Sequence, residues 1–452
     1  MFTSRHSSLA LARGATTIIV LCLLLVACSP IGGLGGGSTT PTAVPTQATP
    51  QGPSATPNNA TVDTCPQQLA TSPHCQTPHS MRVAYGIESL IEHGFTGKGQ
   101  TVVDIVSFGS PTLQQDMDAY DQQFGLPPIK IQVISPLNEK ESDPYGDKAG
   151  WGEETTLDVE IIHALAPDAG IVVLTSPVAE TEGTFGLPEF RQLVQYTIDH
   201  HLGNIISNSW GASEATLKDQ AGQQELQKWN TLLQRATTQQ GITFFAASGD
   251  QGASDFTDMR STKLAPNPTT AFLADNPWVT SVGGTSLLSK GPNPQEVAWN
   301  NSGGGFSAFH SIPSYQQTLP ASIQGLFKNR RGVPDVAADA DPSTALANYV
   351  HGRWTMIGGT SASTPAWAAV GAIANQLAGH PLGFINPGLY KVGTSNIYTQ
   401  AFHDITVGDN SISDGSVDVK GYKAAAGWDA VTGFGSPNTA VLLPALILAL
   451  KQ

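Results

Sequence analysis

The feature that most constrains the fold is a regular alternation of short apolar runs with longer segments of helical apolar spacing, which begins near residue 78. The short runs predict strands and the segments between them predict helices. Strands that alternate with helices form an α/β fold with a mostly parallel sheet covered on both faces. We expect strands at Gln100–Phe108, Gly170–Leu174, Asn204–Ser207, Gly241–Ala247 and Trp278–Val282, and helices at Glu153–Ala164, Phe190–His201 and Gln223–Gln240.

The sequence before that region has a different organisation. Residues 1–28 carry Arg5 and Arg13 before a short apolar run and end in Leu-Val-Ala-Cys28. This pattern predicts a secretion signal, and its end resembles a bacterial lipobox, which implies lipidation of Cys28; an ordinary signal peptide is the alternative. Residues 29–60 are nearly all Gly, Ser, Thr, Pro, Ala, Gln and Asn, a composition that cannot bury a core and predicts a flexible tether.

Two cysteines follow the tether. Residues 61–77 form a short segment that contains Cys65 and Cys75, and outside the cytoplasm such a pair most simply forms a disulfide. Residues 78–452 show no repeat and no further domain boundary, so we expect one domain there. The final run Val441–Leu450 is too short to cross a membrane and predicts a packed terminal helix.

The charge balance excludes one class of partner. The chain has a formal net charge of −14 at pH 7, so we expect no nucleic-acid partner. Charged residues make up 13% of the chain, about half the ordinary ~25%. A surface with few ion pairs loses little stability when carboxylates become protonated, which favours tolerance of acid. We expect a monomer.

One glycine turn presents a serine. Gly358-Gly-Thr-Ser361 precedes the small apolar run 366–374, which predicts a buried helix. A serine at a sharp turn into a helix is well placed to act as a nucleophile, because the free amides and the helix dipole favour developing negative charge. The alternative is a turn with a capping serine.

The general base of such a site is not expected to be a histidine. None of the eleven histidines lies in a His-Gly-Thr-His motif, and His163 is expected to pack within its helix. Glu154 and Asp158 are four residues apart, so their carboxylates share a helix face. Paired carboxyl groups in a cleft share a proton and supply a base that works in acid. An exposed acidic helix face is the alternative; Glu153 and Glu160 are expected to face solvent.

Together these motifs resemble those of the sedolisins, the serine-carboxyl peptidases. The resemblance covers residues 78–452 and implies a subtilisin-like fold and activity at acid pH. Each motif is short, but six of them occur in the family's order: Glu154–Glu160, Ser207–Gly211, Ala247–Asp250, Gly303–Gly305, Arg331–Asp335 and Gly358–Ser361.

The resemblance implies a role for four residues. Ser361 is the nucleophile, Glu154 is the general base and later the acid, and Asp158 orients Glu154 and shares its proton. Asp250 stands where the family has an acid that binds the oxyanion. That role requires a protonated Asp250, because a carboxylate would repel the oxyanion. A turn-forming aspartate is the alternative.

The resemblance also implies a substrate-binding segment, and the chain differs from the family's pattern at two points. Ser209, Trp210 and Gly211 resemble the strand edge that pairs with substrate backbone, with Trp210 near the carboxylates. Many relatives carry an acid near the end of the first strand that extends the proton network. Here Asp104 lies nearby but on a different register, so we do not expect it in the network. Family precursors usually carry a long prodomain, whereas only residues 29–77 separate Cys28 from the domain.

Two late segments resemble the family's calcium site, which implies one bound Ca²⁺. Oxygen ligands suit this cation, and the spacing of every second residue lets successive groups face one ion. His403 is a poor calcium ligand and is expected to pack. The implied ligands are the carboxylates of Asp404 and Asp429 and the carbonyls of Ile405, Ala425 and Gly427.

The sequence therefore predicts an acid-active serine endopeptidase, anchored by lipid to the outer face of a bacterial membrane, that cleaves extracellular proteins. An exopeptidase of the tripeptidyl type is the alternative within the same family. A catalytically silent surface-binding lipoprotein is the alternative from another class, although all four catalytic positions are filled.

Overall fold

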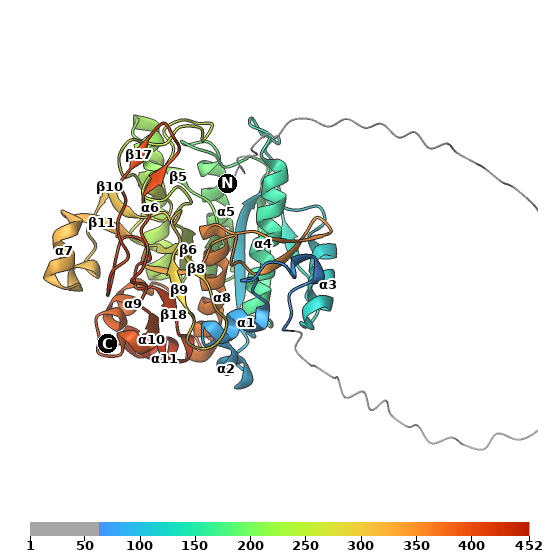
Figure 1. Cartoon of the computed structure of the whole chain (residues 1–452). Helices are drawn as coiled ribbons and strands as arrows, with labels where there is room; N and C mark the ends of the chain where they lie inside the picture. The colour runs from blue at the N-terminus through green and yellow to red at the C-terminus, as the bar shows by residue number, and fades with distance from the viewer. Residues whose placement is uncertain (1–62, 452) are drawn as a thin grey trace, which may run out of the picture. The chain divides into compact units, whose positions relative to one another are not determined.

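The computed structural model describes residues 63–451, which belong to one compact unit (Figure 1). The expected signal segment, the tether and Cys28 lie outside the described residues. Cys65 and Cys75 form a disulfide bond, as expected. Within residues 63–451, none of the helices combines the length and the apolar character needed to cross a bilayer.

The centre of the molecule is a sheet of strand order β12-β8-β6-β4-β1-β3-β2, in which every pair of neighbours is parallel. An eighth strand, β9 (Glu296–Ala298), pairs antiparallel with β8. All five expected strands belong to this sheet. Its parallel strands are β1 (Thr101–Ser107), β2 (Gln132–Ile134), β3 (Gly170–Ser176), β4 (Ile205–Asn208), β6 (Thr243–Ala247), β8 (Thr280–Leu287) and β12 (Val336–Asp339).

Two pairs of helices pack on this sheet (Figure 1). Helices α4 (Lys148–Leu165) and α8 (Thr360–Ala378) contact each other and also β1. Helices α5 (Leu187–His200) and α6 (Gln220–Gln239) form the second pair, and α5 contacts β1 and β3. The three expected helices correspond to α4, α5 and α6, and the apolar run after the glycine turn lies in α8.

The remaining elements surround this core. The expected terminal helix is α11, which packs against α8 and α9. The other helices are α1 (Pro78–Ala84), α2 (Ile87–Glu92), α3 (Leu113–Phe124), α7 (Ala321–Phe327), α9 (Asn386–Gly393), α10 (Tyr398–Ala401) and α11 (Thr439–Leu450), with 3₁₀ turns η1 (Gln67–Leu69), η2 (Glu214–Thr216) and η3 (Gln316–Thr318). Small antiparallel pairs are β5 (Ala212–Ser213) with β7 (Ala271–Phe272), β10 (Gly305–Ser311) with β11 (Arg330–Val333), β13 (Ala347–Val350) with β14 (Arg353–Met356), β15 (Phe402–His403) with β18 (Ser436–Pro437), and β16 (Ile412–Ser413) with β17 (Asp418–Val419).

A chain of buried aromatic rings joins α4 to the second helix pair. Trp151 of α4 contacts Phe190 of α5 at 5.9 Å between ring centroids, and Phe190 contacts Trp210 at 4.8 Å. Trp210 in turn contacts Trp229 of α6 at 5.8 Å. All four rings are fully buried, so their apolar area stabilises the packing of three helices and fixes the loop that carries Trp210.

Candidate active site

Ser361 is the second residue of α8 and lies just after a strained glycine turn. Gly359 has a φ of +113°, and a Cβ there would lie 2.6 Å from Oδ2 of Asp250, so only glycine fits. The Ser361 side chain is 2% exposed, and its Oγ lies 3.5 Å from the carbonyl oxygen of Ser209. The turn therefore holds the serine at a helix N-terminus beside the end of β4.

Glu154 of α4 faces this serine. The Ser361 hydroxyl interacts with its carboxyl group and lowers its pKa. The pKa of Glu154 is raised to about 8: burial is the largest cause, the charges of Asp250 and Asp104 add to it, and Ser361 acts in the opposite direction. A carboxyl group whose pKa is raised and which contacts a serine hydroxyl can accept the proton of that serine.

Asp158 lies one turn further along α4 and is completely buried. Its Oδ1 accepts a hydrogen bond of 2.9 Å from the hydroxyl of Ser209. Burial raises the pKa of Asp158 well above its usual range, and the charges of Asp104 and Glu154 add to that effect. The two carboxyl groups expected on one helix face therefore act on each other in the folded protein.

The expectation that Asp104 stays outside the network is wrong. Asp104 lies in the middle of β1, is completely buried, and approaches Asp158 within hydrogen-bonding reach. Among residues 63–451, no group donates a hydrogen bond to either oxygen of Asp104, and burial raises its pKa to about 7. Two carboxylates cannot donate to each other, so a bond between them requires a shared proton. The signal in the sequence was a lone carboxylate inside a strand whose other residues are apolar, because a buried charge needs a partner.

Asp250 follows β6 and contacts the residue before the nucleophile. Its Oδ1 accepts hydrogen bonds from the backbone nitrogen of Thr360 at 2.7 Å and from the Thr360 hydroxyl at 2.9 Å. Burial raises the pKa of Asp250 to about 6, against these two bonds, which lower it. Because Oδ1 is occupied by donors, Oδ2 is the oxygen that is free to carry a proton below about pH 6.

Three other titratable residues of α4 lie away from the nucleophile. Glu153 is exposed, as expected. Glu160 was expected to face solvent, but it is completely buried and accepts hydrogen bonds from the side chain of Asn348 and the backbone of Tyr349, each at 3.0 Å. These donors replace water around a carboxylate that the helix turns inward. His163 is buried as well: its Nε2 lies 2.9 Å from the carbonyl oxygen of Pro127 and 3.2 Å from Asp121.

The segment Ser209–Gly211 lies directly after β4. The Trp210 ring is fully buried among other aromatic rings, so only its backbone can meet a substrate. A Cβ on Gly211 would lie 2.7 Å from the carbonyl oxygen of Phe272, which explains the glycine. The side chain of Ser209 points inward to Asp158, a contact that the sequence did not indicate.

The two late segments with the implied calcium ligands contact each other through Asp404 and Gly427 near the C-terminus. Asp404 accepts hydrogen bonds from the backbone nitrogen of Gly427 at 3.1 Å and from the Tyr398 hydroxyl at 2.8 Å. Asp429 is 4% exposed, and its Oδ2 accepts a bond from the backbone nitrogen of Ala425 at 3.1 Å. Neither carboxylate forms an ion pair within residues 63–451. This set of hard oxygen donors, which no basic side chain neutralises, fits a calcium ion.

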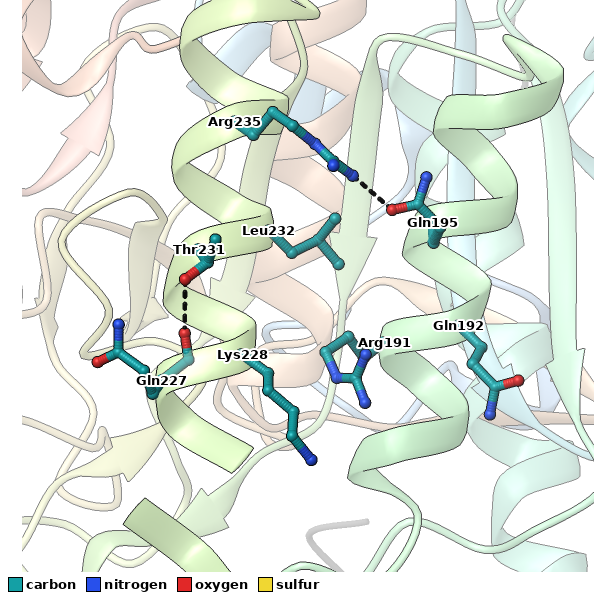
Figure 2. Close-up of a pocket in the computed structure, with 8 residues that line it drawn as sticks. All are labelled: Arg191, Gln192, Gln195, Gln227, Lys228, Thr231, Leu232 and Arg235. Carbon is teal, nitrogen blue, oxygen red and sulfur yellow. Dashed lines mark hydrogen bonds between the residues drawn. The ribbon is translucent and has the colours of Figure 1, made fainter. Parts of the chain in front are cut away.

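A groove of about 440 Å³ lies between α5 and α6 and contains none of these side chains (Figure 2). Arg191 and Lys228 both pair with Glu225, and Arg235 donates to the side chain of Gln195. Because two of its three cations are neutralised within the protein, we assign the groove no ligand. The groove is lined by Arg191, Gln192, Gln195, Gln227, Lys228, Thr231, Leu232 and Arg235.

The fold and this site define a subtilisin-like protein in which carboxyl groups stand where a histidine base would act. The model of the subtilase family matches residues 148–384. The chain is 33% identical over 392 residues to kumamolisin of Bacillus sp. (strain MN-32), a match that covers 85% of this chain and 66% of kumamolisin. It is 33% identical over 312 residues to tripeptidyl-peptidase 1 of Homo sapiens, which covers 66% of this chain and 52% of that protein.

A solved structure shows the same architecture. Pseudomonas sedolisin, a serine-carboxyl proteinase complexed with two molecules of pseudo-iodotyrostatin, superposes with a TM-score of 0.68 at 26% identity. The match covers 82% of this chain and 97% of the sedolisin chain. The chain belongs to the sedolisin family. It spans between about half and two thirds of the length of the curated relatives described above.

Proposed function

We propose that this protein is a serine-carboxyl peptidase that cleaves peptide bonds of extracellular proteins at acid pH. The observation that carries the proposal is the interaction of Ser361 with Glu154, whose carboxyl is coupled to the completely buried carboxyls of Asp158 and Asp104. A histidine base would be protonated and inactive in acid, whereas carboxyl groups that share protons ionise in separate steps, and the first of these steps leaves a base in acid.

In the proposed reaction Glu154 takes the proton of Ser361 while Oγ attacks the carbonyl carbon of the scissile bond. The carbonyl oxygen becomes an oxyanion, to which the protonated Asp250 donates a hydrogen bond. Glu154 then gives its proton to the leaving amine, and an acyl-enzyme remains on Ser361. Water, activated by the same carboxylate, releases the acyl group. Asp158 and Asp104 hold protons behind Glu154 and limit how much charge builds up there.

The backbone of Ser209–Gly211 is the proposed partner of an extended substrate. This segment follows β4 and precedes the short β5, and its backbone lies beside Ser361, so we propose that it serves as a strand edge for the substrate. Peptides that bind at such an edge exchange main-chain hydrogen bonds, which tolerate many side chains. We therefore expect an endopeptidase whose preferences for substrate side chains are determined by residues outside this segment.

A tripeptidyl exopeptidase is the second candidate, favoured by the 33% identity with human tripeptidyl-peptidase 1. The two activities differ in their need for a free substrate N-terminus. A peptide with a free amine and its N-acetylated copy would be digested in parallel, and the products identified by mass spectrometry. Cleavage of both copies at internal bonds supports an endopeptidase, whereas release of tripeptides from the free peptide alone supports the exopeptidase.

We further propose that one Ca²⁺ binds at Asp404 and Asp429, with the carbonyls of Ile405, Ala425 and Gly427. When bound, the ion neutralises two carboxylates that no basic residue compensates.

The proposed location is the outer face of the bacterial membrane, with a lipid on Cys28. The disulfide between Cys65 and Cys75 supports an oxidising compartment. Substitution of Cys28 by alanine should release the protein from the membrane fraction.

The activity is tested by digestion of casein from about pH 2 to pH 8 with the wild-type protein and with Ser361→Ala. We expect digestion that is strongest in acid and that is lost in the variant. A wild-type protein that is folded but inactive at every pH would support the silent lipoprotein. An optimum above about pH 7 would argue against the carboxyl mechanism and for a histidine base.

A further inference from the structure

The hydroxyl of Ser209 lies between the nucleophile's backbone and Asp158. It is 2.9 Å from Oδ1 of Asp158 and 3.2 Å from the carbonyl oxygen of Ser361. Ser209 is 1% exposed, so water does not replace either contact. A serine hydroxyl has a single proton, and it can therefore donate fully to only one of these two acceptors at a time.

The carbonyl oxygen of Ser361 lacks its usual helical hydrogen-bond donor because of a proline. In an α-helix this carbonyl accepts from the backbone nitrogen four residues later, which here belongs to Pro365. Proline has no N–H, so the ordinary helical donor is missing. The hydroxyl of Ser209 takes that place from outside the helix.

We propose that Ser209 is a positioning residue that couples the protonation of Asp158 to the first turn of α8, and that Pro365 makes this coupling possible. When Asp158 is protonated, it donates to Ser209, and Ser209 donates to the carbonyl of Ser361. When Asp158 loses its proton, Ser209 turns its hydrogen toward the carboxylate, and the carbonyl loses that donor. The turn that carries the nucleophile thus responds to the protons behind the base. This inference rests on the proposed peptidase function for its catalytic consequence.

The groups around Asp158 determine the sign of the effect. Asp104 of β1 and Glu154 of α4 face it, and both raise its pKa, as burial does. Asp250 acts on Glu154 from the loop after β6. The bond from Ser209 is the contact that lowers the pKa of Asp158. Its removal should make the carboxyl pair harder to ionise, and its reinforcement should make the pair easier to ionise.

The first test compares Ser209→Ala with Ser207→Ala. We expect Ser209→Ala to lower kcat about tenfold with little change in KM, and to move the acid limb of the pH–rate profile up by about one pH unit. Ser207 is the matched control, because it is a buried serine at the end of the same strand whose hydroxyl has no hydrogen-bond partner. Its loss should leave both quantities in place. A Ser209→Ala profile with the wild-type acid limb would overturn the proposal.

The second test is Pro365→Ala, a variant that should fold because alanine is the best helix former and the neighbouring residues are mostly small. The alanine that replaces Pro365 would supply the missing N–H to the carbonyl of Ser361 and leave Ser209 free to donate to Asp158. We expect the acid limb to move down, opposite to the shift in Ser209→Ala. Shifts in the same direction would show that both changes only disturb packing, and would overturn the coupling.

A third measurement does not depend on activity. In the inactive Ser361→Ala background, Ser209→Ala, Pro365→Ala and the double variant would be unfolded with denaturant at acid pH. We expect Pro365→Ala to stabilise the protein more in the presence of Ser209→Ala than in its absence, because only then does the carbonyl lack a donor. Strictly additive effects would overturn the hydrogen-bond exchange. A wild-type protein without peptidase activity would refute the proposed function and leave this cycle interpretable.

Discussion

The catalytic carboxyl groups and the carboxyl groups of Asp404 and Asp429 near the C-terminus have different neighbours. Behind Ser361, the carboxyl of Asp158 meets the carboxyl of Asp104 and a serine hydroxyl. Near the C-terminus, Oδ1 of Asp429 accepts hydrogen bonds from the backbone nitrogens of Val431 at 2.8 Å and Thr432 at 2.9 Å. Both regions are acidic, and among the described residues neither forms a salt bridge with a basic side chain.

This difference assigns different chemistry to the same residue type. Carboxyl groups that face each other must share protons, so the first cluster can pass a proton to and from a reacting group. Carboxylates that accept from backbone amides are held in one orientation, and the donors favour the ionised form. Such a pair is suited to a fixed cation. The predictions below test each side of this contrast.

The largest effect is expected for Glu154→Gln, which keeps the size of the side chain but cannot accept a proton. We expect kcat to fall by about 10² to 10⁴, or by more, because the serine and its base act as a unit. The measurement is kcat on one peptide at the acid optimum, with folding checked by circular dichroism. If the folded variant keeps near-full activity, Glu154 is not the base.

His163→Gln is the matched control for that experiment, because His163 is a titratable residue of the same helix. Its ring contacts Asp121 and the carbonyl of Pro127 rather than the nucleophile. The change should cost about 1–3 kcal/mol of stability and leave the pH optimum in place. A folded but inactive His163→Gln would point to a histidine base instead.

The next effect concerns the alkaline side of the activity profile. The pKa of Asp250 is raised to about 6, so the group is protonated below that pH and ionised above it. Once ionised it repels the oxyanion, and activity should fall about tenfold per pH unit above about pH 6. Asp250→Asn cannot ionise, and its amide still donates. We expect this variant to be about tenfold less active in acid and to lose activity only at higher pH.

A wild-type-like fall between about pH 6 and pH 8 in Asp250→Asn would assign the alkaline limb to another group. The profiles would be compared as kcat/KM, which reports on the free enzyme. Thr360 supplies the two hydrogen bonds that hold Asp250, so its hydroxyl allows a smaller test. Thr360→Val removes one hydrogen-bond donor and should raise the pKa of Asp250. The alkaline limb of the kcat/KM profile should then move to slightly higher pH.

A smaller effect is expected for Asp104→Asn and is best seen in stability. The pKa of Asp104 is about 7 in the folded protein and lies near 4 in the unfolded chain. A raised pKa means that the folded state binds the extra proton, so its contribution is complete below about pH 4 and is lost as the pH rises through about 7. At pH 7, Asp104→Asn should be more stable than the wild type by about 4 kcal/mol, and the gap should close at pH 4.

That measurement would use denaturant unfolding in the Ser361→Ala background, which prevents self-digestion. Glu160→Gln supplies the comparison on α4, because Glu160 accepts its bonds from Asn348 and Tyr349 and does not face the network. In the active protein, which keeps Ser361, its loss should leave the pH–rate profile unchanged. An Asp104→Asn protein whose stability tracks the wild type at every pH would show that Asp104 shares no proton with Asp158.

Periodicity and motif order predicted much of this molecule. The five strands, the three helices and the glycine turn were all predicted from local sequence patterns. In each strand or helix, the spacing of apolar residues reflects the face that is buried. The positions of Asp104 and Glu160 did not follow. Both side chains are buried because partners distant in sequence, Asp158 and Asn348, meet them in the folded chain. Polar residues in buried elements depend on such long-range contacts, and a single sequence does not show them.

The role of the Ser209 side chain could not be predicted from the sequence either. The motif indicated a substrate-binding backbone, and nothing in it showed that the hydroxyl points inward to Asp158. The missing N–H of Pro365 was visible in the sequence, but its consequence depends on how α8 meets the end of β4. Side-chain direction at a strand end is set by packing, here by the buried Trp210 next to Ser209.

The smallest effect is expected at the proposed calcium site and should concern stability before chemistry. Calcium that binds only the folded state adds about 2.7 kcal/mol at a concentration 100-fold above its Kd, which corresponds to a fall in Tm of roughly 5 °C when a chelator removes it near neutral pH. Asp404→Asn should lower the Tm of the calcium-loaded protein and abolish the response to chelator. Asp414→Asn is the control, since Asp414 is exposed in the same late region and bonds only to the local turn at Ser416 and Val417. The response should also weaken as the pH falls, because protons compete for the carboxylates and burial raises the pKa of both of them. If metal-free and calcium-loaded proteins melt together, the two carboxylates do not hold calcium, and the contrast between proton-sharing and cation-holding carboxyls fails on that side.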